Sequence, residues 1–138
     1  MSSLETPFFT ISLDFELFWG VHDVKSISNY GDNILGARIA IPRLLKMFES
    51  FEIRATWATV GLLTFENKKE MLTYIPKEQP RYVNKQLDPY AHIRNVGNSE
   101  KDDPYHFGYS LVKQIQETPG MEIASHSFSH FYCLEKNT

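Results

Sequence analysis

The chain has 138 residues, of which 42% are hydrophobic and 14% aromatic, so it is long enough to form one domain with a packed core. Its formal net charge of -3 provides no basic field of the kind that attracts nucleic acid or an anionic membrane surface, and we expect neither partner. The only cysteine, Cys133, excludes an intramolecular disulfide and an all-cysteine metal site.

The beginning of the chain bears on its location in the cell. Met1 to Pro7 lack the basic start and apolar stretch of a secretory signal. No apolar run in the sequence approaches the ~20 residues that a membrane-spanning helix needs. Together with the lone cysteine, these features predict a cytoplasmic protein without a membrane span.

Strand and helix patterns alternate through the first half of the chain. Polar and apolar residues alternate from Phe8 to Asp14, which predicts a strand. Apolar residues at helical spacing predict a helix from about Ile41 to Phe51, with Pro42 in its first turn. A second strand is expected from Ile53 to Val60 and a short helix from Asn67 to Tyr74.

The second half begins with a long loop. Residues 76–106 are rich in proline and polar side chains and show little apolar periodicity, which favours a functional loop excursion. A further helix is expected to end at the Pro119-Gly120 turn, followed by a third strand from Met121 to Ser125. This alternation of strands and helices predicts an α/β fold with a parallel sheet.

Polar side chains follow the first and the third predicted strands. Asp14 and Glu16 come after the first, and His126 and His130 after the third. Because chemistry gathers at the carboxyl ends of parallel strands, both clusters should project into the same mouth. Two histidines four residues apart on a helical turn bring both rings to one side, where they can share a metal. A pair of surface or packed histidines is the alternative interpretation of this spacing.

The two carboxylates need a physical explanation as well. Asp14 and Glu16 share a face if the strand continues, and together they cost folding energy unless a cation compensates. Alternatively, Glu16 begins a solvated loop and Asp14 caps a turn. With the histidines, a two-histidine, one-carboxylate metal site is the better account. Such a site serves hydrolysis and iron-dependent oxygenation, and the second carboxylate, as a base, favours amide hydrolysis.

Other histidines and aromatic side chains, the tyrosines Tyr74, Tyr82, Tyr90, Tyr105 and Tyr109 among them, are weaker candidates for a role in the site. We expect His22 to be a solvated loop residue at the rim of the mouth, and His92 and His106 to be surface or substrate-loop residues. Trp19 and Trp57 could stack on sugar rings, but burial is the commoner explanation for such aromatics.

Three short segments, spaced so that they span nearly the whole chain, carry a familiar pattern: Thr10-Ile11-Ser12-Leu13-Asp14-Phe15-Glu16, Arg54-Ala55-Thr56-Trp57-Ala58-Thr59-Val60-Gly61 and Glu122-Ile123-Ala124-Ser125-His126-Ser127-Phe128-Ser129-His130. They resemble the polysaccharide deacetylase family, the family four carbohydrate esterases that include chitin and peptidoglycan deacetylases. The last segment is the most specific and departs from the family chiefly at Ala124, where members carry glycine. The resemblance implies a deformed seven-stranded (β/α) barrel, of which residues 1–138 form the N-terminal part of one catalytic domain, truncated after about the third strand.

The resemblance also implies a function. His126 and His130 match the family's ligands of a divalent metal, expected to be zinc, and Asp14 matches the catalytic base. Glu16 would be the carboxylate ligand, although many members carry two adjacent aspartates or Asp-x-Asp at this point. The implied enzyme is a hydrolase of carbon–nitrogen bonds other than peptide bonds, and it removes N-acetyl groups from a polysaccharide or oligosaccharide.

The resemblance finally sets an expectation for the isolated chain. Thr138 lies eight residues after His130, whereas the later half of such a barrel supplies an arginine, an apolar substrate wall and a second catalytic histidine. We therefore expect little or no turnover from this chain by itself. The alternative is a catalytically inactive carbohydrate-binding or scaffolding domain with the same fold. Exposed strand edges are expected to favour a homo-oligomer.

Overall fold

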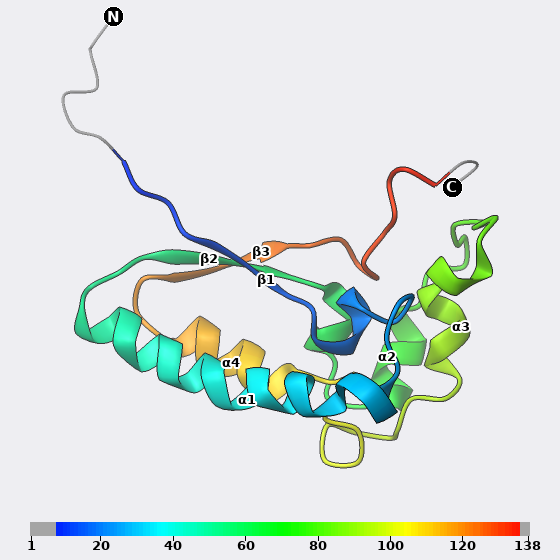
Figure 1. Cartoon of the computed structure of the whole chain (residues 1–138), viewed down its shortest axis with the longest axis horizontal. Coiled ribbons are helices and arrows are strands. Elements are labelled where there is room, and N and C mark those ends of the chain that lie inside the picture. Colours follow the sequence, from blue (N-terminus) through cyan, green and yellow to red (C-terminus); the bar gives the residue numbers. More distant parts are fainter. Residues whose placement is uncertain (1–7, 136–138) are drawn as a thin grey trace, which may run out of the picture.

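The structure is a computed structural model and describes residues 8–135. Met1 to Pro7, from which the lack of a signal peptide was predicted, lie outside the described residues. The elements follow in the order β1 (Ser12–Phe15), 3-10 helix η1 (Leu17–Gly20), α1 (Ile27–Ser50), β2 (Ala55–Thr59), 3-10 helix η2 (Gly61–Thr64), α2 (Lys68–Tyr74), 3-10 helix η3 (Lys85–Leu87), α3 (Pro89–Ile93), α4 (Tyr109–Glu117) and β3 (Met121–Ser125), as Figure 1 shows.

The three strands form one parallel sheet in the order β1-β2-β3. Asp14 lies opposite Ala58 in the β1–β2 pair, and Ala58 lies opposite Ala124 in the β2–β3 pair. The predicted α/β class and parallel sheet are therefore confirmed. Within residues 8–135 the sheet has two edges, β1 and β3, and does not close into a barrel.

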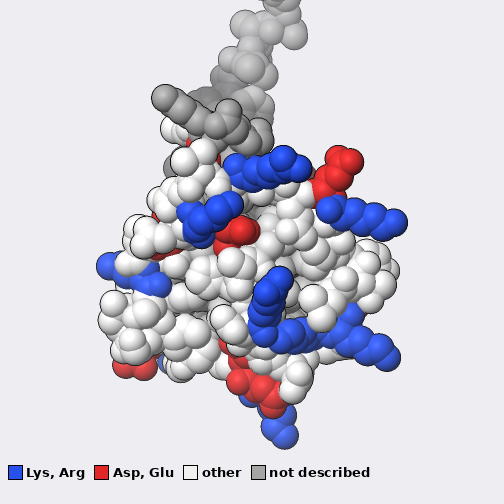
Figure 2. All heavy atoms as spheres, turned by 90° about the vertical axis from the view of Figure 1, so that its right-hand side faces the viewer, with Lys and Arg blue, Asp and Glu red and all other residues white. Residues whose placement is uncertain are grey.

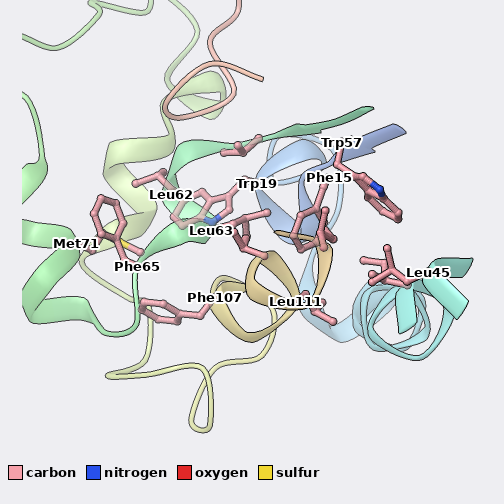
Figure 3. Packing of buried hydrophobic residues seen from close by; sticks show 14 of the residues in the cluster. Phe15, Trp19, Leu45, Trp57, Leu62, Leu63, Phe65, Met71, Phe107 and Leu111 are labelled. Carbon is pink, nitrogen blue, oxygen red and sulfur yellow. The ribbon is translucent and has the colours of Figure 1, made fainter. Parts of the chain in front are cut away.

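Helices α1 and α4 lie along one face of the sheet, while α2 and α3 lie beyond the carboxyl ends of the strands (Figure 1). The core between the sheet and the helices contains Phe15, Trp57 and Leu45 (Figure 3). Trp19, next to the sheet, is fully buried, and Trp57 is 3% exposed. Burial of both tryptophans, preferred over sugar stacking from the sequence, is confirmed.

Helix α1 is longer than its apolar pattern predicted. It begins at Ile27, where the backbone N–H of Ser26 donates to Asn29 Oδ1, and it contains Pro42 in its interior. The prediction that Pro42 lies in the first turn is wrong. A proline inside a helix removes one backbone hydrogen bond, but the apolar face, with Ile34 and Leu45 buried, runs through this position and stabilises the longer helix.

Strand β1 is shorter than predicted. The predicted strand from Phe8 to Asp14 is regular only from Ser12, and Phe8 and Phe9 are 77% and 89% exposed. The reason lies in the partner strand, since Ser12 is the first β1 residue paired with β2. Alternation of side chains alone could not show where the neighbouring strand begins.

The predicted loop excursion over residues 76–106 contains two short helices, η3 and α3. Each begins with a side chain that accepts a backbone N–H: Asn84 accepts from Gln86, and Asp88 accepts from Tyr90. Pro89 occupies the first position of α3, where a proline is well tolerated. The prolines that suggested a loop therefore include one that starts a helix.

A buried polar network fastens the segment before α4 to η1. The Asp103 carboxylate accepts from Gly97 N at 2.8 Å and from His106 Nδ1 at 2.8 Å. The carbonyl of His106 in turn accepts from the indole N–H of Trp19 at 2.9 Å. This network holds η1, which follows Glu16 directly, against the rest of the fold.

The surface seen from the right-hand side of Figure 1 carries both signs of charge. Lysine and arginine side chains occur there with aspartate and glutamate among them (Figure 2). No helix within residues 8–135 has the length and apolar character required to cross a membrane.

Candidate metal centre

The candidate site lies at the carboxyl ends of β1 and β3. Glu16 is the first residue after β1, and His126 is the first residue after β3. Backbone hydrogen bonding joins the two strand ends through β2, because the N–H of His126 donates to the carbonyl of Thr59 at 2.9 Å. The parallel topology therefore brings together residues that are more than a hundred positions apart in the sequence.

Three side chains converge there. Glu16 Oε1 lies 2.8 Å from His126 Nε2 and 3.3 Å from His130 Nε2. The ligand atoms of Glu16, His126 and His130 all lie within 4.8 Å of one another, close enough to hold one metal ion. Within residues 8–135 this is the only group of three histidine, cysteine or acidic residues with that property.

Asp14 lies beside this group rather than in it. Its Oδ1 is 3.7 Å from Nδ1 of His126, the ring nitrogen that faces away from Glu16. The Asp14 side chain is 60% exposed, whereas that of Glu16 is 23% exposed. Asp14 points out from β1, and Glu16 has already left the strand on the way into η1, so the two carboxylates meet the histidines from different directions.

The histidines lie on a turn, not on a helix. Residues 126–130 have no helical structure, and Ser127 and His130 adopt left-handed backbone angles, with φ of 60° and 57°. The predicted helical turn is therefore wrong, although the two imidazole rings are 5.3 Å apart, as sharing of a metal requires. The turn docks on η2, where Gly61 N donates to the Ser127 carbonyl at 3.0 Å.

The charges within the group support one another. Hydrogen bonding to His130 lowers the pKa of Glu16 against the opposing effect of burial, and the charges of both histidines lower it further. The same hydrogen bond raises the pKa of His130, again against burial. Glu16 and His130 therefore stabilise each other's charged form, and a divalent ion bound here would replace the histidine as the cationic partner of the carboxylate.

Two glycines shape the site, and the sequence analysis did not identify either. A Cβ on Gly20 would collide with the Glu16 carboxylate, and a Cβ on Gly61 would lie 3.1 Å from Cα of Phe128 in the histidine turn. The only sequence signal was their position, each within a few residues of a strand end. A single sequence does not distinguish such close-approach glycines from ordinary turn glycines.

The predictions for two histidines outside the group are wrong. His22 and His106, expected in solvent or on the surface, are each 6% exposed. His22 donates from Nδ1 to the Trp19 carbonyl at 2.8 Å, and His106 pairs with Asp103. His92 is half-buried, and its ring centroid is 5.0 Å from that of His22. Long-range packing of the loop excursion against η1 buries these rings.

The fold and the site together define an α/β protein with a small parallel sheet and a histidine–glutamate group that could hold a metal ion. Comparison of the chain with models of known protein families, with curated proteins and with solved structures finds no significant match.

Proposed function

We propose that Glu16, His126 and His130 bind one zinc ion and that the protein is a hydrolase of the polysaccharide deacetylase type, acting on N-acetyl groups of a polysaccharide or oligosaccharide. The observation that carries the proposal is the convergence of the three ligand atoms within 4.8 Å of one another at the carboxyl ends of parallel strands. The resemblance of the three sequence segments supports the deacetylase class. The geometry of the three side chains supports the binding of a metal ion.

The donor set suits zinc. Two imidazole nitrogens and one carboxylate oxygen are ordinary zinc ligands, and three protein ligands leave a position for catalysis. The three side chains are between 21% and 31% exposed, so a substituent on a polymer can reach them from solvent. A zinc ion held there would act as a Lewis acid toward the carbonyl group of the substrate.

Asp14 is the residue best placed to act as a base. Its carboxylate lies beside His126 but is largely exposed, so an oxygen remains free to accept a proton from an attacking water. Its contact with Nδ1 of His126 would also orient that imidazole toward the zinc. Glu16, whose oxygen faces both histidine rings, is the ligand in this assignment.

Zinc titration with a competing chelator tests the metal site. We expect one zinc per chain and at least about a 100-fold loss of affinity in Glu16→Gln, because even outer partners of zinc ligands are worth about 10–100-fold. Glu122→Gln is the matched control, since Glu122 is an exposed acid on β3 near the other end of the strand. Equal zinc affinity in the two variants would refute the site.

The role of Asp14 is tested separately. Because little or no turnover is expected from this chain by itself, the first readout is zinc stoichiometry, which Asp14→Asn should keep. Where the parent protein does release acetate from N-acetylated oligosaccharides, the rate should fall by about 10²–10⁴-fold in Asp14→Asn, the usual contribution of a general base. A variant that loses zinc as completely as Glu16→Gln would make Asp14 a ligand instead. A folded protein that binds no zinc would favour the metal-free carbohydrate-binding or scaffolding alternative.

A further inference from the structure

The His130 ring contacts Glu16 through Nε2, but its second nitrogen, Nδ1, has no such partner. Metal-binding histidines usually donate their second ring N–H to a carboxylate or a carbonyl, which fixes the direction of the ring. His126 has Asp14 beside its Nδ1, at 3.7 Å. Nδ1 of His130 is buried and makes no hydrogen bond to another residue within the described part of the chain. Apart from its contact with Glu16, the His130 ring is therefore oriented by packing.

The backbone at His130 increases this need. His130 has φ of 57°, in the left-handed region that non-glycine residues rarely adopt. Such a conformation costs roughly 1–3 kcal/mol and persists only where surrounding contacts enforce it. The backbone carbonyls of the turn dock on η2, but these contacts involve Ser127 and Phe128 rather than His130.

Tyr132 provides a contact of the required kind. Its ring meets the His130 ring edge to face, with centroids 5.3 Å apart and an interplanar angle of 73°. On its other sides Tyr132 contacts His22, with centroids 6.0 Å apart, and Tyr82, with centroids 6.2 Å apart. Three rings from three separate segments thus surround one tyrosine.

The neighbours of Tyr132 are themselves fixed. His22 is 6% exposed and donates from Nδ1 to the Trp19 carbonyl at 2.8 Å, so its ring cannot rotate freely. Tyr82 is 1% exposed. Trp19 belongs to η1, the helix that follows Glu16. A chain of packed groups therefore connects the segment carrying Glu16 with the segment carrying His130.

We infer that Tyr132, packed between His22 and Tyr82, is a positioning residue that holds the His130 imidazole toward Glu16. This inference rests on the proposed zinc site. The contact that links Tyr132 to the candidate ligands is its ring contact with His130, through which it acts. The ring, rather than the hydroxyl, carries the effect.

The test measures zinc affinity and apo-protein melting in parallel for variants of one segment. Tyr132→Leu keeps apolar volume but removes the ring, and we expect zinc affinity to fall about 10–100-fold, the range for residues that orient a ligand. Tyr132→Phe keeps the ring and should stay within about twofold of the parent protein. Phe131→Ala is the matched control, because the ring contact of Phe131 is with Tyr82 rather than with His130.

The outcomes separate this inference from the proposed site. A parent protein that binds no zinc defeats the site itself. If the parent protein binds zinc and Tyr132→Leu binds it equally tightly, the zinc site stands and only the positioning role of Tyr132 is refuted. Equal losses in Tyr132→Phe and Tyr132→Leu would assign the effect to the hydroxyl and overturn the packing argument. Should Tyr132→Leu melt much earlier than the parent, zinc affinity is compared at a temperature at which both apo-proteins are folded, and equal affinities there would overturn the inference.

Discussion

The Glu16 carboxylate reaches the histidines because the residue four positions later has no side chain. Gly20 lies where its absent Cβ would overlap the Glu16 side chain. Glycine is needed here because the Glu16 side chain lies close to the backbone of residue 20. An unusual backbone angle is not the reason, since Gly20 does not have a positive φ. A single methyl group at this position would compete directly with a proposed zinc ligand.

Gly20→Ala should therefore weaken zinc binding. We expect about a 10–100-fold loss of affinity, comparable to other changes that misplace a ligand. Chelator competition measures the effect. Gly36→Ala in α1 is the control, because no atom lies within 4 Å of the added Cβ there, and zinc affinity should not change. Equal affinities in the two variants would contradict the assigned position of Glu16.

Asp103 governs a different property, the response to acid. Burial opposes ionisation of this carboxyl, but hydrogen bonds from His106 and from the N–H of Gly97 prevail and lower its pKa. A lowered pKa in the folded state stabilises the protein above the unfolded pKa of about 3.9, and this stabilisation is lost as the pH falls through the lower, folded value.

Asp103→Asn should therefore be less stable at neutral pH, by about 1–3 kcal/mol for a buried hydrogen-bonded group. Between about pH 5 and pH 3 its free energy of unfolding should fall less than that of the parent, because the variant lacks the carboxyl group that titrates. Urea unfolding across about this range measures both effects. Asp102→Asn is the control, because Asp102 is the adjacent acid and is exposed, with its carboxylate accepting a hydrogen bond from the Ser99 hydroxyl. Parallel pH profiles for Asp103→Asn and the parent would refute the role of Asp103.

At the scale of elements, α1 illustrates how packing overrides a local signal. Pro42 lacks the N–H that would bond the carbonyl four residues earlier, yet α1 continues from Ile27 to Ser50. Ile41 and Leu45 on either side of it are buried against the sheet and α4. The free energy of that apolar contact exceeds the loss of one helical hydrogen bond.

Pro42→Ala should consequently stabilise the protein. Alanine restores the missing hydrogen bond, and the gain is at most about 3 kcal/mol, the difference between the two residues in a helix interior. Thermal unfolding followed by circular dichroism at 222 nm would show a higher midpoint. A lower midpoint would mean that the proline ring itself makes packing contacts worth more than the hydrogen bond.

At the scale of the whole molecule, the sheet has an open edge on each side within the described residues, because each outer strand pairs with a neighbour on one side only. β1 and β3 are its edges, and in β3 Ile123 is 38% exposed. Parallel sheets in proteins are generally covered on both faces and have few long exposed edges. Open edges of this kind can pair with another copy, and self-association through an edge, which the sequence predicts, stays a prediction.

Ile123→Lys should reduce any such association, because a charged side chain at a strand edge opposes pairing with another copy. Light scattering at several concentrations measures the mass of the parent and of the variant. Leu72→Lys, in which an exposed leucine of α2 is changed, is the control that alters charge equally without touching an edge. A parent protein that stays monomeric at every concentration would refute the edge argument.

The sequence by itself determined the strand-and-helix alternation and the parallel sheet. It also indicated the candidate site residues Asp14, Glu16, His126 and His130. Periodic patterns and strand ends are local properties, so a single chain reveals them. It did not show the shape of the histidine turn, the true start of α1, or the burial of His22 and His106.

Only the tertiary structure decided which carboxylate faces both imidazoles and which rings lie behind them. Glu16 contacts His130 although the two residues lie near opposite ends of the chain, and the indole N–H of Trp19 donates to the carbonyl of His106, 87 positions away. Such distances are set by how helices and loops pack on the sheet, through burial summed over many residues, and no local pattern encodes that sum.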